Sequence, residues 1–384
     1  MAWFWFYLAA SICASTALLW LQLAIGMSRV RWLRDIEPPD AFAWPKVSIL
    51  VPARNEEREI AIALQSLLQL DYPDYEVLVI NDRSTDRTGE ILTQMQADYP
   101  QLQVATVTDL PGGWLGKNHA LFFGAEQARG ELLLFTDADI VMQPSTLRRS
   151  VVYFQREQLD HLAMAPACEM PTWFLEGFVV LFIMLFTTFT KPWKVRDPKS
   201  PAHVGIGAFN LLRKSAYQAS GTHRAIAMRP DDDLKLGKLV KQHGFRQEML
   251  NGSGFILVRW YSSVRELING LMKNAFSGVD YHVGFTLFTS VSLLLINVWP
   301  FVAVWITTGA VRWLYAITIA LHLISYSCVA WQAKARWWDV LAYPVYYLLF
   351  VYIQWRAMAL TYWNDGIYWR DTHYSLAELK ANKV

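Results

Sequence analysis

The sequence predicts an α/β domain with a Rossmann-like, mostly parallel sheet, inserted between transmembrane helices. An uncharged apolar run opens the chain from Trp3 to Met27, and three more apolar stretches lie near the other end. Between them, from Pro45 to Asp280, short apolar strands alternate with segments whose apolar residues recur at helical spacing. That order is typical of a parallel sheet covered by helices. Of the 384 residues 54% are hydrophobic, so part of the chain is expected in lipid.

The first apolar run is expected to be an uncleaved transmembrane anchor, which forms a domain of residues 1–28. The run is long enough to cross about 30 Å of hydrocarbon as a helix. A signal peptide would carry positive charge ahead of its apolar run, whereas Arg29, Arg31 and Arg34 follow this one. Because basic residues mark the cytoplasmic side of a span, we expect an integral protein of the cell membrane. Its middle domain, 45–280, is expected in the cytoplasm.

The predicted C-terminal membrane region covers residues 284–362. Its three apolar stretches run at about Phe285–Thr308, Val311–Ala330 and Asp339–Leu360, and tryptophans that suit interfacial belts flank them. Arg356 and Pro344 make the last stretch the weakest candidate span. A re-entrant or interfacial hairpin is therefore an open alternative there. Residues 363–384 are then a polar tail.

A further apolar run, Pro171–Trp193, interrupts the α/β domain. A helix that is hydrophobic all round is unusual inside a soluble domain. If this helix spanned the membrane, Asp139 and Asp233 would lie on opposite sides of it. We therefore expect a helix at about 173–190 that lies in or at the membrane interface.

The strand and helix candidates follow one another in a regular order. Strands are expected in "VSILVPA", "YEVLVIND", Gln103–Thr106 and Leu132–Phe135, and helices in "IAIALQSLLQL", "TGEILTQMQADY" and "KNHALFFGAEQA". Sheets of this kind bind ligands outside the carboxyl ends of their strands. Polar and acidic side chains fall there: Asn55, Glu56, Asp82, Asp137 and Asp139.

Asp137 and Asp139 form a carboxylate pair directly after the buried strand "LLLF". At i and i+2 on an extended segment, two side chains point to the same side, so both carboxylates can approach one hard cation. A cation in that place could neutralise a diphosphate leaving group. An ordinary turn after a strand is the alternative interpretation.

Three consecutive aspartates in "RPDDDLKLG" are a second chemical candidate. The alternative interpretation makes Asp231 a helix N-cap and places Asp232 and Asp233 as favourable charges in the first turn.

Charge and cysteine content narrow the classes of partner. The formal net charge is +2, so there is no global basic field of the kind that binds nucleic acid, and no nucleic-acid partner is expected. Cys13, Cys168 and Cys328 are scattered and odd in number, which argues against a disulfide framework or a cysteine metal site.

Six segments occur in the order in which one known family has them: "VSILVPARNEE", "VLVINDRSTDRT", "GWLGKNHAL", "LLLFTDADI", "GAFNLLRKSAYQASGTH" and "DDDLKLGKLVKQHG". On these segments, the region from Val47 to about Gly278 resembles the family 2 glycosyltransferases, which have the GT-A fold. "GWLGK", "TDAD" and "GTH" together are most similar to the membrane-bound branch with ceramide glucosyltransferases and hopene- or carotenoid-associated glycosyltransferases.

The resemblance implies a nucleotide-sugar donor, most simply a UDP-sugar. Pro52, Ala53, Arg54 and Glu56 would border the uracil and ribose, and Asp82 would hold the nucleoside. Acceptors at strand ends suit a uracil N–H and sugar hydroxyls.

The resemblance also implies contacts for the diphosphate and for a divalent metal. Lys117 would lie beside phosphate oxygens as a compact charge. Asp139 would be the more direct ligand of Mg²⁺ or Mn²⁺, with Asp137 nearer the donor sugar or ribose. His223 of "GTH" could contact acceptor or phosphate, and a packed, uncharged histidine is the alternative.

The catalytic base of the family would fall in the aspartate cluster. Counting back from Gly244 aligns Asp233 with the base and Asp232 with the acidic residue that precedes it. A slip of one residue would make Asp232 the base.

The implied activity is that of a membrane-bound, inverting glycosyltransferase with a lipid acceptor. A processive polysaccharide synthase is the first alternative, but the Gln-x-x-Arg-Trp motif expected of it is not visible, and Lys273 and Asn274 stand at its place. A polyprenyl-phosphate glycosyltransferase is the second, for which Arg213, Lys214 and Arg224 would be the residues to probe. A non-enzymatic membrane protein or transporter would not need six ordered motifs.

Overall fold

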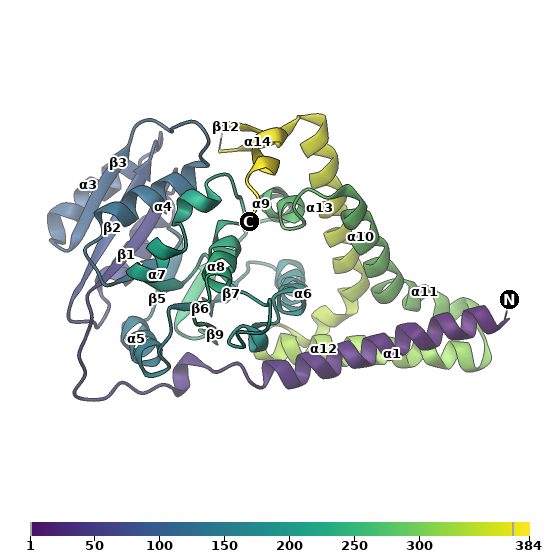
Figure 1. The fold of residues 1–384 in the computed structure, drawn as a ribbon. Helices are drawn as coiled ribbons and strands as arrows, with labels where there is room; N and C mark the ends of the chain where they lie inside the picture. Colours follow the sequence, from purple (N-terminus) through teal and green to yellow (C-terminus); the bar gives the residue numbers. More distant parts are fainter. Residues whose placement is uncertain (1, 371) are drawn as a thin grey trace. The chain divides into compact units, whose positions relative to one another are not determined.

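The computed structural model describes residues 2–370 and 372–384. These residues form two compact units (Figure 1). The sheet unit consists of Val30–Glu169, Thr190–Arg259 and Ala381–Val384. The helical unit consists of the residues up to Arg29, Met170–Phe189 and Trp260–Lys380.

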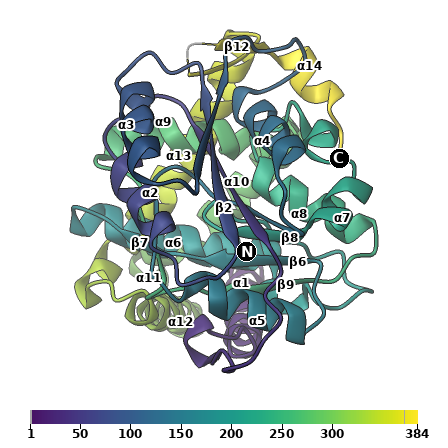
Figure 2. The same cartoon turned by 90° about the vertical axis from the view of Figure 1, so that its left-hand side faces the viewer.

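Within the described residues, the sheet unit is built around a seven-stranded sheet in the order β3-β2-β1-β4-β8-β6-β9. Its strands are β1 (Val47–Ala53), β2 (Tyr75–Asp82), β3 (Leu102–Val107), β4 (Leu132–Phe135), β6 (His161–Ala165), β8 (Asn210–Arg213) and β9 (Gln247–Asn251). β1 pairs in parallel with β2 and β4, and β2 with β3. β8 is antiparallel to β4 and β6, whereas β6 and β9 are parallel. β8, β6 and β9 follow one another in Figure 2. The predicted mostly parallel sheet is confirmed.

The central strands are apolar because the sheet is buried on both faces. All four residues of β4 are buried, as are six of the seven in β1. Strands covered on both sides read as near-continuous hydrophobic runs, and this is why they could be recognised in the sequence. On one face the strands share a core with α4 (Gly116–Gln127) and α8 (Asp232–Gln242), formed by residues that include Leu50, Ile80, Phe135, Leu121, Leu236 and Val240.

The three predicted helices of this unit are confirmed as α2 (Ile60–Leu68), α3 (Thr88–Asp98) and α4. Further elements are the helices α5 (Thr146–Arg156) and α7 (Lys214–Ala219) and a small sheet in the order β5-β10-β7. Its strands are β5 (Ile140–Met142), β10 (Ile256–Arg259) and β7 (Ala167–Glu169). This small sheet, the strands β6, β8 and β9, and the helices α5 and α7 add to what the sequence predicted.

The helical unit is made mainly of helices, with α1 lying along α12 (Figure 1). They are α1 (Ala2–Met27), most of α6 (Trp173–Thr190), α9 (Val264–Ser277), α10 (Val283–Asn297), α11 (Trp299–Ile306), α12 (Gly309–Gln332) and α13 (Tyr343–Trp363). His322 of α12 joins two other helices, because its Nδ1 lies 2.9 Å from Tyr343 Oη and 3.4 Å from Trp20 Nε1. In hydrocarbon, polar groups need partners inside the protein, so these contacts favour one packing of the helices.

Of the described helices, three are long and apolar enough to cross a membrane: Trp3–Met27, Trp173–Lys194 and Gly309–Gln332. α10 and α11 qualify only together, and they are bent by 45° at the break between them, as in a broken span or a re-entrant loop. The predicted anchor is thus a helix of spanning length. The placement of α6 at the interface and the predicted domain boundaries stay predictions. Residues 363–384, predicted as a polar tail, include β11 (Gly366–Trp369), β12 (Thr372–Ser375) and α14 (Leu376–Ala381).

Candidate active site

A pocket within the sheet unit lies at the carboxyl ends of β1 and β4. It is lined by five of the predicted site residues, Pro52, Lys117, Asp137, Asp232 and Asp233. The other lining residues are Leu121, Phe135, Thr136, Gly207, Asn210, His223 and Leu236. The parallel sheet therefore brings side chains from four separate segments to one edge, as such sheets do for their ligands.

Lys117, in the first turn of α4, is the cation of this pocket. Its Nζ lies 2.8 Å from Asp137 Oδ1 and 3.4 Å from Asp232 Oδ2. Burial by itself would lower the pKa of Lys117, but the carboxylates of Asp137, Asp232 and Asp233 outweigh burial and raise it. The lysine therefore stays charged, and the pocket holds one positive charge among three carboxylates.

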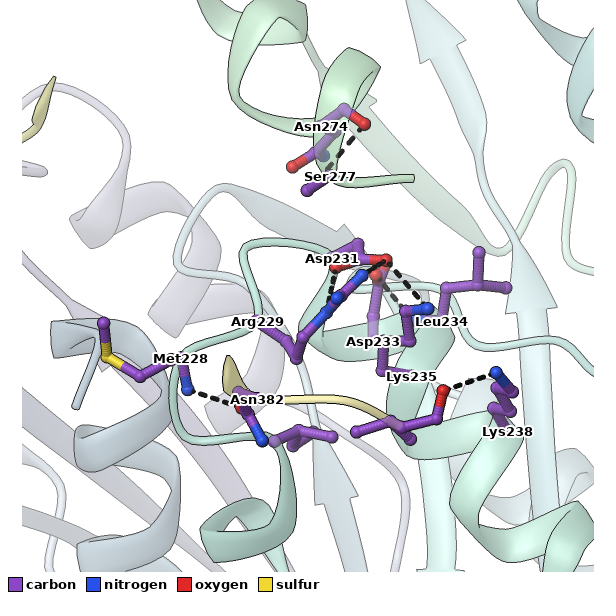
Figure 3. A network of polar contacts seen from close by, with 12 residues as sticks. Met228, Arg229, Asp231, Asp233, Leu234, Lys235, Lys238, Asn274, Ser277 and Asn382 are labelled. Atoms are coloured by element: carbon purple, nitrogen blue, oxygen red, sulfur yellow. Dashed lines mark hydrogen bonds and ion pairs between the residues drawn. The ribbon is translucent and has the colours of Figure 1, made fainter. Parts of the chain in front are cut away.

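Asp231 and Asp232 are both buried, and each meets a different cation. Asp231 occupies the N-cap position of α8, but its carboxylate faces Arg229, whose Nε and Nη2 each donate to it at 3.0 Å (Figure 3). Asp232 faces Lys117. Asp231 therefore belongs to a buried ion pair that shapes the start of the helix, and Asp232 belongs to the pocket.

Asp233 is the most exposed of the three aspartates, and backbone N–H groups hold its carboxylate. Gly207 N donates to Oδ2 at 2.8 Å, and Leu234 N donates to Oδ1 at 2.7 Å. Burial is the largest cause that raises the pKa of Asp233, and Asp137 adds to it, whereas Lys117 and the two N–H donors lower it. The pKa ends above its ordinary value, which suits a proton acceptor better than an ordinary surface carboxylate.

A glycine loop, Val204–Gly207, lies directly against the aspartates. A methyl group at Gly205 would overlap the backbone carbonyl of Asp233, and one at Gly207 would overlap the carboxylate of Asp137. Gly207 also links both residues through its backbone, because Asp137 N donates to its carbonyl at 3.1 Å while its own N–H donates to Asp233. At both glycines the absence of a side chain allows the backbone to approach other groups of the protein closely.

The carboxylate of Asp139 lies near two other carboxylates, those of Asp137 and Glu56. Burial, together with the nearby carboxylates of Asp137 and Glu56, raises the pKa of Asp139 to about 7. Among the described residues, no three His, Cys, Asp or Glu side chains are arranged to hold a metal ion. Mg²⁺ commonly takes one or two carboxylates and completes its shell with water and substrate phosphates. The residues thus fit a divalent cation that phosphate oxygens help to hold.

The predicted nucleoside side of the site is built from β1, β2 and the loops that follow them. Asp82 is buried at the end of β2, and its carboxylate accepts from Arg83 Nε at 2.7 Å and from Nη2 at 3.0 Å. Glu56 N donates to Thr88 Oγ1 at 2.8 Å. Ala53 is 1% exposed, so its backbone rather than its methyl group is what a ligand could meet. Arg54 follows it, half-buried.

His223, one of the residues that line the pocket, is a packed, uncharged histidine. Its Nδ1 lies 2.8 Å from Tyr217 Oη, and its ring lies against Phe135. Burial, with Lys117 as a second cause, lowers the pKa of His223 to about 3.

Thr136 and Asn210 line the pocket but were absent from the predicted site. The signal for Asn210 was a polar residue inside the apolar run "AFNLL".

Most of the chain is similar in sequence or structure to known proteins. Residues 48–221 match the family described as Glycosyl transferase family 2. The 4,4'-diaponeurosporenoate glycosyltransferase of Staphylococcus aureus (strain USA300) is 26% identical over 239 residues, which are 62% of this chain and 62% of that protein. Mannosyltransferase PcManGT from Pyrobaculum calidifontis, solved in complex with GDP-Man and Mn²⁺, has a TM-score of 0.56 at 18% identity, over 93% of this chain and 98% of that one. At 18% identity, this structural similarity shows a shared fold and nothing more.

Proposed function

Because residues 48–221 match the Glycosyl transferase family 2 and the sheet unit has a GT-A fold, we propose that the protein is a membrane-bound, inverting glycosyltransferase. It moves a sugar from a nucleotide sugar to a lipid acceptor. The observation that supports this best is the pocket at the strand ends, where Lys117 lies among carboxylates that include Asp233. A lysine suits phosphate oxygens, and a carboxylate of raised pKa suits proton transfer.

The donor binds across the carboxyl ends of β1, β2 and β4 in this proposal. Asp82 accepts from the nucleoside, exchanging its ion pair with Arg83, and Lys117 donates to the diphosphate. Asp139, with Asp137, holds Mg²⁺ or Mn²⁺, which when bound neutralises charge on the diphosphate. The mannosyltransferase of similar fold was solved with GDP-Man and Mn²⁺, which supports a nucleotide donor and a divalent metal. UDP as the nucleotide rests on the motif resemblance.

Transfer is a single displacement at the anomeric carbon of the sugar. The acceptor oxygen bonds to that carbon while the bond from the carbon to the diphosphate oxygen breaks, and the acceptor proton passes to the Asp233 carboxylate. In this proposal Asp137 and Asp139 hold the metal beside the diphosphate, and Asp232 faces Lys117, so Asp233 is the carboxylate that accepts the proton. Gly207 and Leu234 keep the Asp233 carboxylate in a fixed orientation, and Lys117 stabilises the charge of the leaving group.

The acceptor is proposed to be a lipid with a hydroxyl or carboxyl group. Three helices of spanning length support a membrane location, and the curated relative is a glycosyltransferase named for 4,4'-diaponeurosporenoate. The sheet unit is proposed to face the cytoplasm, where nucleotide sugars are made.

The two enzymatic alternatives have less support. A processive synthase would need the Gln-x-x-Arg-Trp motif. Lys273 stands where the arginine of that motif would be, and its Nζ lies 4.8 Å from the centroid of the Trp369 ring. For a polyprenyl-phosphate acceptor, Arg213 and Lys214 would have to meet the phosphate. Arg213 instead faces Glu131 at 3.4 Å, and Lys214 Nζ donates to the Ala128 carbonyl at 2.6 Å.

Transfer by the purified full chain in detergent tests the proposal. The protein is incubated with labelled UDP-sugars and GDP-sugars, membrane lipid extract and Mg²⁺ or Mn²⁺, with and without EDTA. We expect label in the organic phase from at least one donor, inverted anomeric configuration of the product, and loss of transfer in EDTA. If every donor leaves the lipids unlabelled, the proposed function is wrong, and full activity in EDTA would remove the metal from it.

A further inference from the structure

The glycine loop against Asp233 is held by two side-chain amides as well as by the base itself. Val204 N donates to Gln247 Oε1 at 3.0 Å, and Ile206 N donates to Asn210 Oδ1 at 3.1 Å. One residue further on, Gly207 N donates to Asp233. The backbone of the loop is thus fixed at alternate positions by Gln247 and Asn210 before it reaches the base.

A single buried histidine in turn holds both amides. His161 Nε2 lies 3.0 Å from Asn210 Oδ1, and His161 Nδ1 lies 2.6 Å from Gln247 Nε2. An amide oxygen only accepts and an amide nitrogen only donates. The neutral ring with its hydrogen on Nε2 is therefore the form that satisfies both contacts. The second hydrogen of Gln247 Nε2 goes to the Gly237 carbonyl at 2.9 Å, which fixes the orientation of that amide.

The three residues come from three adjacent strands, because His161 begins β6, Asn210 begins β8 and Gln247 begins β9. All three side chains are at most 2% exposed. Buried polar networks whose members are all satisfied are rigid and define a single arrangement. Asn210 lines the pocket. His161 is not among the lining residues and is connected to the pocket through its contact with Asn210.

We propose that His161 is a positioning residue for sugar transfer. It orients the Asn210 and Gln247 amides, these hold the Val204–Gly207 loop, and the loop sets the direction of the Asp233 carboxylate. The proposal rests on the proposed role of Asp233 as the base.

The close fit of the loop makes its position critical for the base. Gly205 lies against the Asp233 backbone so closely that a methyl group would overlap it. The loop therefore cannot move toward α8 without displacing Asp233. A misplacement of reacting groups by about 1 Å can lower a rate by about 100-fold.

Two substitutions at His161 and one beside it form the test. His161→Leu removes both contacts, and His161→Gln keeps a donor that can reach Asn210. Leu162→Ala is the control for lost packing, since Leu162 is fully buried on the same strand and neighbouring residues of a strand point to opposite faces. The rates are compared at a temperature where all the variants are folded.

We expect kcat to fall by about 10- to 100-fold in His161→Leu and by less in His161→Gln, with nucleotide affinity close to that of the parent protein. Leu162→Ala should lower the melting temperature while kcat stays near the parent value. If His161→Leu fails to fold, His161→Gln carries the same comparison with Leu162→Ala. Equal kcat values in the His161 and Leu162 variants would contradict the proposal and show that His161 has only a structural role.

Hydrogen exchange of the loop amides gives a second result that does not depend on activity. The amides of Val204, Ile206 and Gly207 should exchange faster in the His161 variants than in Leu162→Ala. Unchanged exchange in the His161 variants would overturn the proposal even if the parent protein transfers sugar. A parent protein without transfer activity would refute the proposed function and leave the exchange comparison to decide the positioning.

Discussion

Asp231, Asp232 and Asp233 are neighbours in the chain, yet each carboxylate meets a different partner. Successive residues of a helix point in directions about 100° apart, so the first faces Arg229, the second Lys117 and the third the glycine loop. The sequence could point to the cluster but could not separate its members, because their partners lie on other segments or depend on the exact start of α8.

Asp231→Asn should destabilise the sheet unit without removing a pocket group. Breaking one partner of a buried ion pair costs about 3 kcal/mol or more, since the Arg229 guanidinium would stay buried with less compensation. Thermal unfolding in detergent measures the loss. Asp35→Asn is the control, because its pair with Arg34 is exposed on both sides and should contribute less than about 1 kcal/mol. Equal melting temperatures of the two variants would contradict the buried-pair assignment.

His161 should make the stability of the folded protein fall in mild acid. Burial lowers the pKa of His161 to about 4, against about 6.5 in the unfolded chain. The unfolded state therefore binds more protons between these values, and stability is lost as the pH falls through that range. The loss is about 2 kcal/mol between about pH 7 and pH 5. The free energy of unfolding, measured across this pH range, should change less with pH in His161→Gln than in the parent protein. An identical pH dependence in the two proteins would show that His161 does not titrate this way.

At the scale of elements, the strands β1, β2, β3 and β4 could be predicted, whereas β6, β8 and β9 could not. β1, β2, β3 and β4 are buried apolar runs alternating with helices, a pattern that local sequence shows. β8 inserts between β4 and β6 only through long-range pairing, which no local period records. The same reason hid His161 and Gln247, because the contacts of His161 with Asn210 and with Gln247 depend on the order of three strands.

Gly205→Ala tests the fit between the glycine loop and α8. The added methyl group overlaps the Asp233 carbonyl, so either the loop or the helix must move, at a cost of about 1–3 kcal/mol. Transfer should fall by about 100-fold because the base moves with its backbone. Gly112→Ala is the matched control, since a methyl group there meets no described atom within 4 Å. Parent-like kinetics in Gly205→Ala would mean that the loop is free to adjust.

At the scale of the whole molecule, composition indicated a membrane protein and the helices of spanning length agree with it. The side of the membrane on which the sheet unit lies rests on Arg29, Arg31 and Arg34, which follow the first span. That orientation decides whether a nucleotide sugar can reach the pocket in the cell.

Cysteine labelling tests the orientation. In a chain whose three native cysteines are replaced by serine, Asp74→Cys offers a position in the sheet unit whose side chain is 58% exposed. It should react with a membrane-impermeant reagent only after the cells are opened. Trp3→Cys, at the other end of the first span, should react in intact cells. Labelling of Asp74→Cys in intact cells would contradict the cytoplasmic placement and the proposed supply of donor.

The central claim is that Asp233 accepts the proton during inverting transfer of a sugar. The most direct measurement compares Asp233→Asn with Asp232→Asn for the initial rate of glycolipid formation and for nucleotide affinity. Asparagine keeps the size of the side chain and removes its basicity, so transfer by Asp233→Asn should fall by about two to four orders of magnitude. Its nucleotide affinity should stay near the parent value, because Asp82 and Asp139 are unchanged. A near-parent rate in Asp233→Asn beside an inactive Asp232→Asn would contradict the account and move the base to Asp232.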